Sequence, residues 1–100
     1  MAIIELSVVP IGTGTTSLSN YVAGAVKVLR EEENIKYELT AMGTIIEGEL
    51  ERLLAIAKRM HQSAFDAGAM RVVTTVKIDD RRDKTSSISG KMASVKQKLE

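Results

Sequence analysis

The sequence predicts an α+β fold in which a four-stranded antiparallel sheet carries two helices on one face, with a third helix after the last strand. Alternating apolar residues and apolar stripes at helical spacing follow one another in the order strand, helix, strand, strand, helix, strand, helix. Only three residues separate the second and third predicted strands, so these two strands should pair as a hairpin. This order is the ferredoxin-like βαββαβ pattern with one added helix. With 100 residues, the chain is expected to form a single domain over residues 1–100.

The four predicted strands are apolar segments bounded by turn residues. The first covers residues 3–9 and is expected to end at Pro10, because proline offers no N–H group to a strand ladder. Residues 35–40 and 44–47 form the hairpin. The fourth strand covers residues 72–78 and is β-branched at nearly every position, which favours extended backbone.

Each predicted helix has a one-sided apolar stripe. The first helix covers residues 17–33, with Ser17 as its N-cap, and the acidic run 31–33 opposes the helix dipole, so its last turn is expected to fray. The second helix covers residues 49–67 and stops before Gly68. The stripe of the first helix consists of Leu18, Val22, Val26 and Leu29. That of the second consists of Leu50, Leu53, Leu54, Ala57, His61, Ala64 and Phe65, and that of the third of Ile88, Met92, Val95 and Leu99.

Two helices cover only one face of such a sheet, so the other face must be polar or be covered by something else. Alternation along the strands assigns to this open face Ile3, Glu5, Ser7, Val9, Glu38, Thr40, Ile45, Glu47, Val73, Thr75, Lys77 and Asp79. The aliphatic residues among them would leave an exposed apolar patch. We therefore expect the protein to associate with copies of itself through this face or an adjoining edge.

The composition excludes several classes of function. The chain has no cysteine, which rules out disulfides, thiolate metal sites and cysteine nucleophiles and fits a reducing compartment. Its net charge of +1 gives no general attraction to nucleic acid or to an anionic membrane. The first residues lack the basic start of a signal peptide, and no apolar run is long enough to span a membrane, so we expect a cytoplasmic protein.

The predicted hairpin, residues 37–49, is the most informative stretch for function. Its polar residues Glu38, Thr40 and Glu47 fall where a strand presents them to one face. A sheet face with hydroxyls and carboxylates among apolar residues is either part of an interface or a place where a polar molecule binds. The sequence has no other candidate of equal specificity.

Several motifs of this chain resemble the small thiamine-binding proteins of bacteria, archaea and fungi. They are SVVPIGT at 7–13, YELT at 37–40, MGT at 42–44, IEG at 46–48 and VTTVKIDDRRD at 73–83. The resemblance covers essentially the whole chain and implies a ferredoxin-like fold and a homotetramer built as a dimer of dimers. Related two-repeat proteins bind thiamine or its hydroxymethylpyrimidine moiety. The resemblance thus implies a binding protein without catalysis, without a cofactor and without a metal.

The resemblance implies a ligand site near the start of the hairpin and the end of the first strand. The residues that we assign to it are Ser7, Pro10, Thr40, Met42, Gly43, Thr44 and Glu47. The Glu47 carboxylate would accept a hydrogen bond from the amine of the aminopyrimidine, and the hydroxyls of Ser7 and Thr44 would match its other donors and acceptors. Met42 offers a soft packing surface for a flat ring.

Other interpretations of these residues stay open at this point. Glu47 could instead form part of the acidic start of the second helix or an intersubunit ion pair. The charged run 79–83 is either a solvated turn, with Asp83 or Thr85 capping the last helix, or an intersubunit cluster. For the cluster, the assigned interface residues are Lys77, Asp79, Arg81 and Arg82.

Other functions fit the sequence less well. An acylphosphatase needs an arginine-bearing phosphate loop with an asparagine, and neither Asn20 nor Asn34 lies in such a loop. A sheet that binds RNA needs strand aromatics, and the strands hold only Tyr37. His61, the single histidine, lies on the apolar stripe of its helix and is expected to be a hydrogen-bonded residue at the edge of the core. The alternative that remains is an oligomeric scaffold or regulatory module with a different small-molecule or protein partner.

Overall fold

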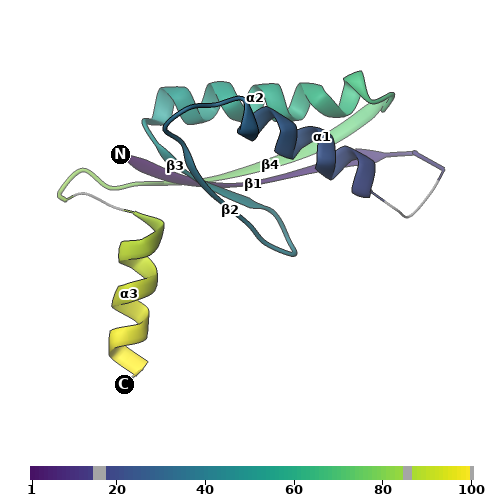
Figure 1. Cartoon of the computed structure of the whole chain (residues 1–100). Helices are drawn as coiled ribbons and strands as arrows, with labels where there is room; N and C mark the ends of the chain where they lie inside the picture. The colour runs from purple at the N-terminus through teal and green to yellow at the C-terminus, as the bar shows by residue number, and fades with distance from the viewer. Residues whose placement is uncertain (15–17, 85–86, 100) are drawn as a thin grey trace.

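The elements of the computed structural model, which describes residues 1–14, 18–84 and 87–99, follow the predicted order (Figure 1). They are β1 (Ala2–Ile11), α1 (Ser19–Arg30), β2 (Lys36–Leu39), β3 (Thr44–Gly48), α2 (Leu50–Asp66), β4 (Arg71–Asp80) and α3 (Ile88–Leu99). The strands form one sheet in the order β2-β3-β1-β4, and every pair is antiparallel. The predicted ferredoxin-like α+β fold is therefore confirmed.

The first strand is longer than predicted and continues through Pro10. Pro10 lies opposite Val72 of β4, whereas β3 pairs with β1 only as far as Leu6. Beyond Leu6, in the described part of the chain, β1 has a strand neighbour on one side only. A proline without an N–H group is tolerated at such an edge, so the expectation that Pro10 ends the strand was wrong.

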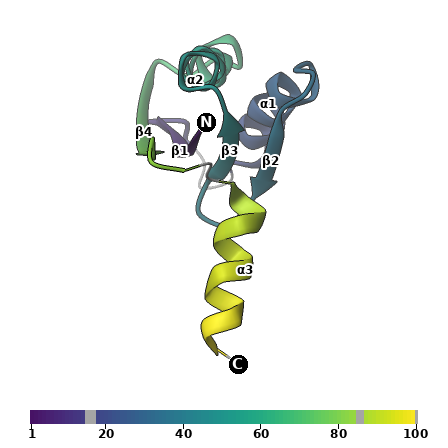
Figure 2. The same cartoon turned by 90° about the vertical axis from the view of Figure 1, so that its left-hand side faces the viewer.

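The core lies between the sheet and the two helices α1 and α2, which together cover one face of the sheet (Figure 2). Its buried side chains are Ala2, Ile4, Leu6, Ala25, Leu29, Ile46, Leu53, Ile56, Ala57 and Met60. The apolar stripe of α2 differs from the predicted one, because Ile56 and Met60 are buried while Leu54 is exposed. Successive helix positions differ by about 100° around the axis, so burial of Leu53 turns Leu54 toward solvent.

The inner side of α1 is also shifted from the prediction. Ala25 and Leu29 are its buried residues, and Val22 is exposed. The helix begins at Ser19, and Leu18 before it provides no side-chain cap. The predicted cap, Ser17, lies outside the described residues.

The third helix lies on the opposite side of the sheet from α1 and α2 and points away from it (Figures 1 and 2). None of the residues in α3 that the structure describes is buried. The radius of gyration is 14.8 Å, larger than the value of about 13 Å typical of a compact chain of this length. Only the start of α3 meets the open face of the sheet.

The register places seven of the predicted open-face residues, together with Lys36, in two rows that run across all four strands. One row is Glu38, Ile45, Glu5 and Lys77, and the next is Lys36, Glu47, Ile3 and Asp79. The start of α3 lies over the second row, where Ile3 and Glu47 are buried. Val73, farther along β4, stays 46% exposed. The predicted open face is thus correct, but the chain covers part of it with its own C-terminal helix.

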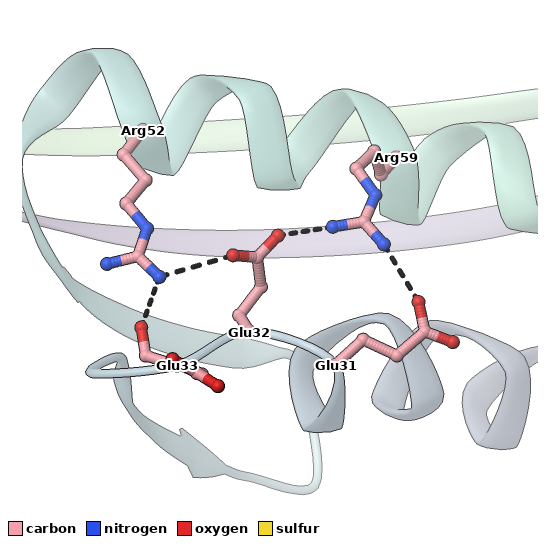
Figure 3. Close-up of polar contacts among 5 residues, drawn as sticks. All are labelled: Glu31, Glu32, Glu33, Arg52 and Arg59. Atoms are coloured by element: carbon pink, nitrogen blue, oxygen red, sulfur yellow. Dashed lines mark hydrogen bonds and ion pairs between the residues drawn. The ribbon is translucent and has the colours of Figure 1, made fainter.

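The acidic run 31–33, predicted as the frayed last turn of the first helix, lies just beyond the end of α1. The helix ends at Arg30, and the run binds two arginines of α2 (Figure 3). Arg52 donates to the Glu32 carboxylate at 3.2 Å and to the Glu33 carbonyl oxygen. Arg59 donates to the Glu31 carboxylate at 2.9 Å and also to Glu32. These contacts tie the end of α1 to the outer side of α2.

Glu32 has two arginine partners, so its side chain should contribute more stability than its neighbour Glu33 does. We expect Glu32→Ala to lower the free energy of unfolding by about 1–2 kcal/mol, because it removes two charge-assisted contacts. Glu33 contributes to the cluster only through its backbone carbonyl among the described contacts. Glu33→Ala should therefore change stability by less than about 0.5 kcal/mol. Urea denaturation of both variants measures the difference, and equal losses would contradict the assignment.

Candidate functional site

A cavity of about 320 Å³ lies beside the turn between β2 and β3. It is bounded by α1, by the second half of β1 and by the turn itself. Five of the seven predicted ligand residues line it: Ser7, Thr40, Met42, Gly43 and Thr44. We call this space the hairpin cavity. Its volume is at the lower end of the range of about 300–1,000 Å³ usual for small-molecule pockets.

Thr40 and Gly43 give the hairpin cavity its shape. The Thr40 hydroxyl accepts hydrogen bonds from the N–H groups of Met42 and Gly43, at 3.3 and 3.1 Å, and donates to the Gly43 carbonyl at 2.9 Å. A Cβ atom on Gly43 would lie 2.9 Å from the Leu6 carbonyl oxygen of β1. Gly43 is therefore required by a close backbone approach, and the Thr40 hydroxyl is already engaged within the turn.

The walls of the hairpin cavity are mainly apolar, with a few hydroxyls. Among the residues that the structure describes, none with a charged side chain lines it. Tyr21 and Thr44 supply hydroxyl groups, and Met42 lies at the mouth, where its side chain is exposed. Ser7 borders the cavity, but strand alternation assigns its side chain to the open face, like that of its partner Thr75. Such a site suits a small neutral ring with hydrogen-bonding groups at its edge.

The other two predicted ligand residues lie elsewhere. Pro10 is buried in β1 and is not among the residues that line the cavity. Glu47 faces the opposite side of the sheet, is only 4% exposed and accepts a hydrogen bond from the Ile88 N–H of α3 at 2.7 Å. Lys36 lies 3.9 Å from its other oxygen. Both partners belong to the same chain, an arrangement that none of the three interpretations of Glu47 from the sequence included.

The start of α3 is capped by Ser87 and Glu47. The Ser87 hydroxyl accepts from the Gly90 N–H at 2.9 Å, so the cap expected at Asp83 lies at Ser87 instead. Thr85, the other predicted cap, lies outside the described residues. Two of the first backbone N–H groups of α3 thus have oxygen acceptors, which fits the positive end of the helix dipole.

The residues assigned to a subunit interface make local contacts in the single chain. Asp79 pairs with Lys91 at 2.6 Å, and Arg82 pairs with Asp80 at 3.1 Å.

Arg81 binds the Asp83 carboxylate with two hydrogen bonds, at 2.5 and 2.8 Å. The neighbouring guanidinium lowers the pKa of Asp83, and the same hydrogen bonds raise the pKa of Arg81. Lys77 is exposed on the open face and makes no ion pair within the described residues.

His61 has a structural environment, as expected. Its Nδ1 atom lies 2.6 Å from the Thr74 hydroxyl of β4, and its ring meets Phe65 edge to face with centroids 5.3 Å apart. No group of three metal-binding side chains occurs in the described ranges 1–14, 18–84 and 87–99. Among these residues, no helix is long and apolar enough to cross a membrane.

A family model described as thiamine-binding protein matches residues 4–96 of the chain. The chain belongs to the thiamine-binding protein family. The family match spans both the hairpin cavity and Glu47, together with most of α3.

Several other proteins are similar to this chain along nearly their whole length. UPF0045 protein YqgV of Bacillus subtilis strain 168 is 46% identical, over 100% of this chain and 99% of that protein. A UPF0045 protein of Methanothermobacter thermautotrophicus is 48% identical, over 95% of this chain and 96% of that protein. The crystal structure of hypothetical protein MJ1052 of Methanocaldococcus jannaschii has a TM-score of 0.86 to this structure at 35% identity, over 94% of each chain.

Proposed function

We propose that this protein binds thiamine or its hydroxymethylpyrimidine moiety as a homo-oligomer and catalyses no reaction. The observation that carries the proposal is the hairpin cavity, which collects five of the residues assigned from the family resemblance in one space. The membership of the thiamine-binding protein family supports the ligand class.

The hairpin cavity fits the aminopyrimidine half of thiamine. This ring is flat and neutral, with an exocyclic amine that donates and ring nitrogens that accept hydrogen bonds. The hydroxyls of Tyr21 and Thr44 supply both kinds of partner, while Met42 and the aliphatic wall pack against the ring faces. A neutral ring requires no buried countercharge, and the described lining provides none.

The lining of the cavity also supports binding without catalysis. Hydroxyl nucleophiles need a neighbouring base to become reactive. Among the described residues, no histidine, carboxylate or amine lines the hairpin cavity beside Ser7 or Thr44. His61 hydrogen-bonds to Thr74, which is not one of the residues lining the cavity.

Self-association is supported by the outer edge of β4. This strand has ten residues and lies at one end of the sheet order. Its residues are largely exposed, including Val73, Val76 and Ile78. A long, exposed apolar edge strand is a template for pairing with another chain. The assigned interface residues Lys77 and Asp79 belong to this strand, and Arg81 and Arg82 follow it.

Isothermal titration calorimetry with thiamine and with hydroxymethylpyrimidine tests the ligand. Wild-type protein should release heat with at least one of them. Thr44→Val should weaken binding by about three- to tenfold, because it removes one hydrogen-bonding hydroxyl and keeps the shape. Thr75→Val is the matched control, since Thr75 lies on the open face outside the cavity, and it should bind like the wild type. No heat with either ligand at high protein concentration would contradict the proposal.

Analytical ultracentrifugation tests the homo-oligomer. The wild type should sediment as a multiple of 10.9 kDa, with a tetramer as the expected species. Val73→Lys places a charge on both the open face and the β4 edge, so it should shift the protein toward smaller species. Leu54→Lys makes the same change at an exposed site on α2 and should leave the assembly intact. A stable wild-type monomer at micromolar concentration would refute self-association.

A further inference from the structure

A second cavity, of about 450 Å³, lies on the open face of the sheet beside the start of α3. We call it the open-face groove. Its apolar floor is formed by Ile3 and Ile45 of the sheet, and its apolar roof by Ile88 and Met92 of α3. Thr40 and Ile78 also line the groove, and its charged side chains are those of Glu5, Glu38, Lys77, Asp79 and Lys91. The hairpin cavity lacks charged side chains among its described lining residues, so the two spaces differ in the ligands they suit.

The sheet register places two carboxylates on either side of an apolar floor. Ile45 of β3 lies opposite Glu38 of β2 on one side and opposite Glu5 of β1 on the other. Glu38 and Glu5 are therefore separated by two strand spacings, about 10 Å. A flat ring lying on Ile45 would have a carboxylate at each edge.

These two carboxylates are the uncompensated charges of the groove. Asp79 is already paired with Lys91 at 2.6 Å. Glu5 and Glu38 make no ion pair or side-chain hydrogen bond with the described residues, and neither does Lys77, which lies next to Glu5 in the row. Two free carboxylates against one free ammonium leave the groove with an excess of negative charge. An organic cation with an apolar ring would satisfy both the floor and the edges.

The roof of the groove is α3, which a few polar contacts hold at its start. Glu47 accepts from the Ile88 N–H, and Lys91 binds Asp79. Met92 lies over the groove, although it is 63% exposed, and methionine is an adaptable surface for a flat ring. A ring between Ile45 and Met92 would give this otherwise exposed helix an apolar contact.

We propose that the open-face groove binds a small flat organic cation between Glu5 and Glu38, under α3. The inference deepens the proposed function, on which it rests for the ligand class. The hairpin cavity suits the neutral pyrimidine half of thiamine, and the open-face groove suits the cationic thiazolium half. The two rings of thiamine are joined by a single carbon atom, so one molecule cannot occupy both spaces, and the groove would take the cationic ring of a separate ligand molecule.

Methionine methyl NMR of the full chain separates the two sites. The chain has five methionines; Met92 lines the open-face groove, whereas Met42 and Met60 line the hairpin cavity. Met70, 92% exposed, serves as the internal reference. The probe is the N-methylated form of hydroxyethyl-methylthiazole, a thiazolium ion that lacks the pyrimidine. Its uncharged parent thiazole is the matched ligand control.

We expect the thiazolium ion to shift the Met92 methyl signal saturably, and the neutral thiazole to bind at least about tenfold more weakly. The double variant Glu5→Gln and Glu38→Gln should bind the thiazolium ion about tenfold or more weakly than the wild type does. Glu51→Gln removes a carboxylate from the first turn of α2, away from the groove, and should change nothing. No saturable shift at Met92, or equal affinity in the double variant, would overturn the inference.

The same spectra distinguish failure of the inference from failure of the proposed function. If hydroxymethylpyrimidine shifts Met42 and Met60 while the thiazolium ion leaves Met92 unchanged, the proposed function stands and the groove assignment falls. If the thiazolium ion shifts Met92 with the expected charge dependence but hydroxymethylpyrimidine gives no heat and leaves Met42 and Met60 unchanged, the groove assignment stands and the hairpin-cavity assignment is wrong. If no ligand binds, both fail.

Discussion

The contact between the Glu47 carboxylate and the Ile88 N–H organises the open face of the sheet. A carboxylate in the middle of a sheet face is costly to bury without partners. Here the start of α3 supplies an N–H donor and the positive end of a helix dipole, and Lys36 lies near the second oxygen. The same contact holds the start of α3 over one row of the sheet, and α3 in this position forms the roof of the open-face groove.

The hairpin separates two environments because side chains of a strand alternate between its faces. On the helix side, the turn closes against β1 through Gly43 and leaves a cavity lined by hydroxyls and aliphatic groups. On the other side, the same strands present carboxylates beside α3. The space on the helix side therefore suits a neutral ring, and the groove on the other side suits a cationic one. The free edge of β4 lies across the sheet from the hairpin and stays available for self-association.

Much of this organisation could be predicted from the sequence, because element order and strand alternation are local patterns. They predicted the fold and the open-face residues, whereas the assignment of Ser7, Met42 and Thr44 to one site beside the turn came from the family resemblance. The partner of Glu47 could not be predicted in this way, since residues 47 and 88 are joined only by tertiary packing. The contacts of Arg52 and Arg59 with the acidic run after α1 were not predicted for the same reason, since they too depend on tertiary packing. The inner side of α2 was misplaced because Leu53 and Leu54 are equally apolar, and packing decides which one is buried.

Hydrogen–deuterium exchange of α3 in Glu47→Ala tests most directly whether Glu47 holds this helix on the open face. Loss of a hydrogen bond to a charged acceptor should raise the exchange rate of residues 88–99 about tenfold or more, while β1 and α2 keep wild-type rates. Glu51→Ala, a carboxylate removed from the exposed side of α2, serves as the control and should leave α3 unchanged. Wild-type exchange of residues 88–99 in Glu47→Ala would contradict the account.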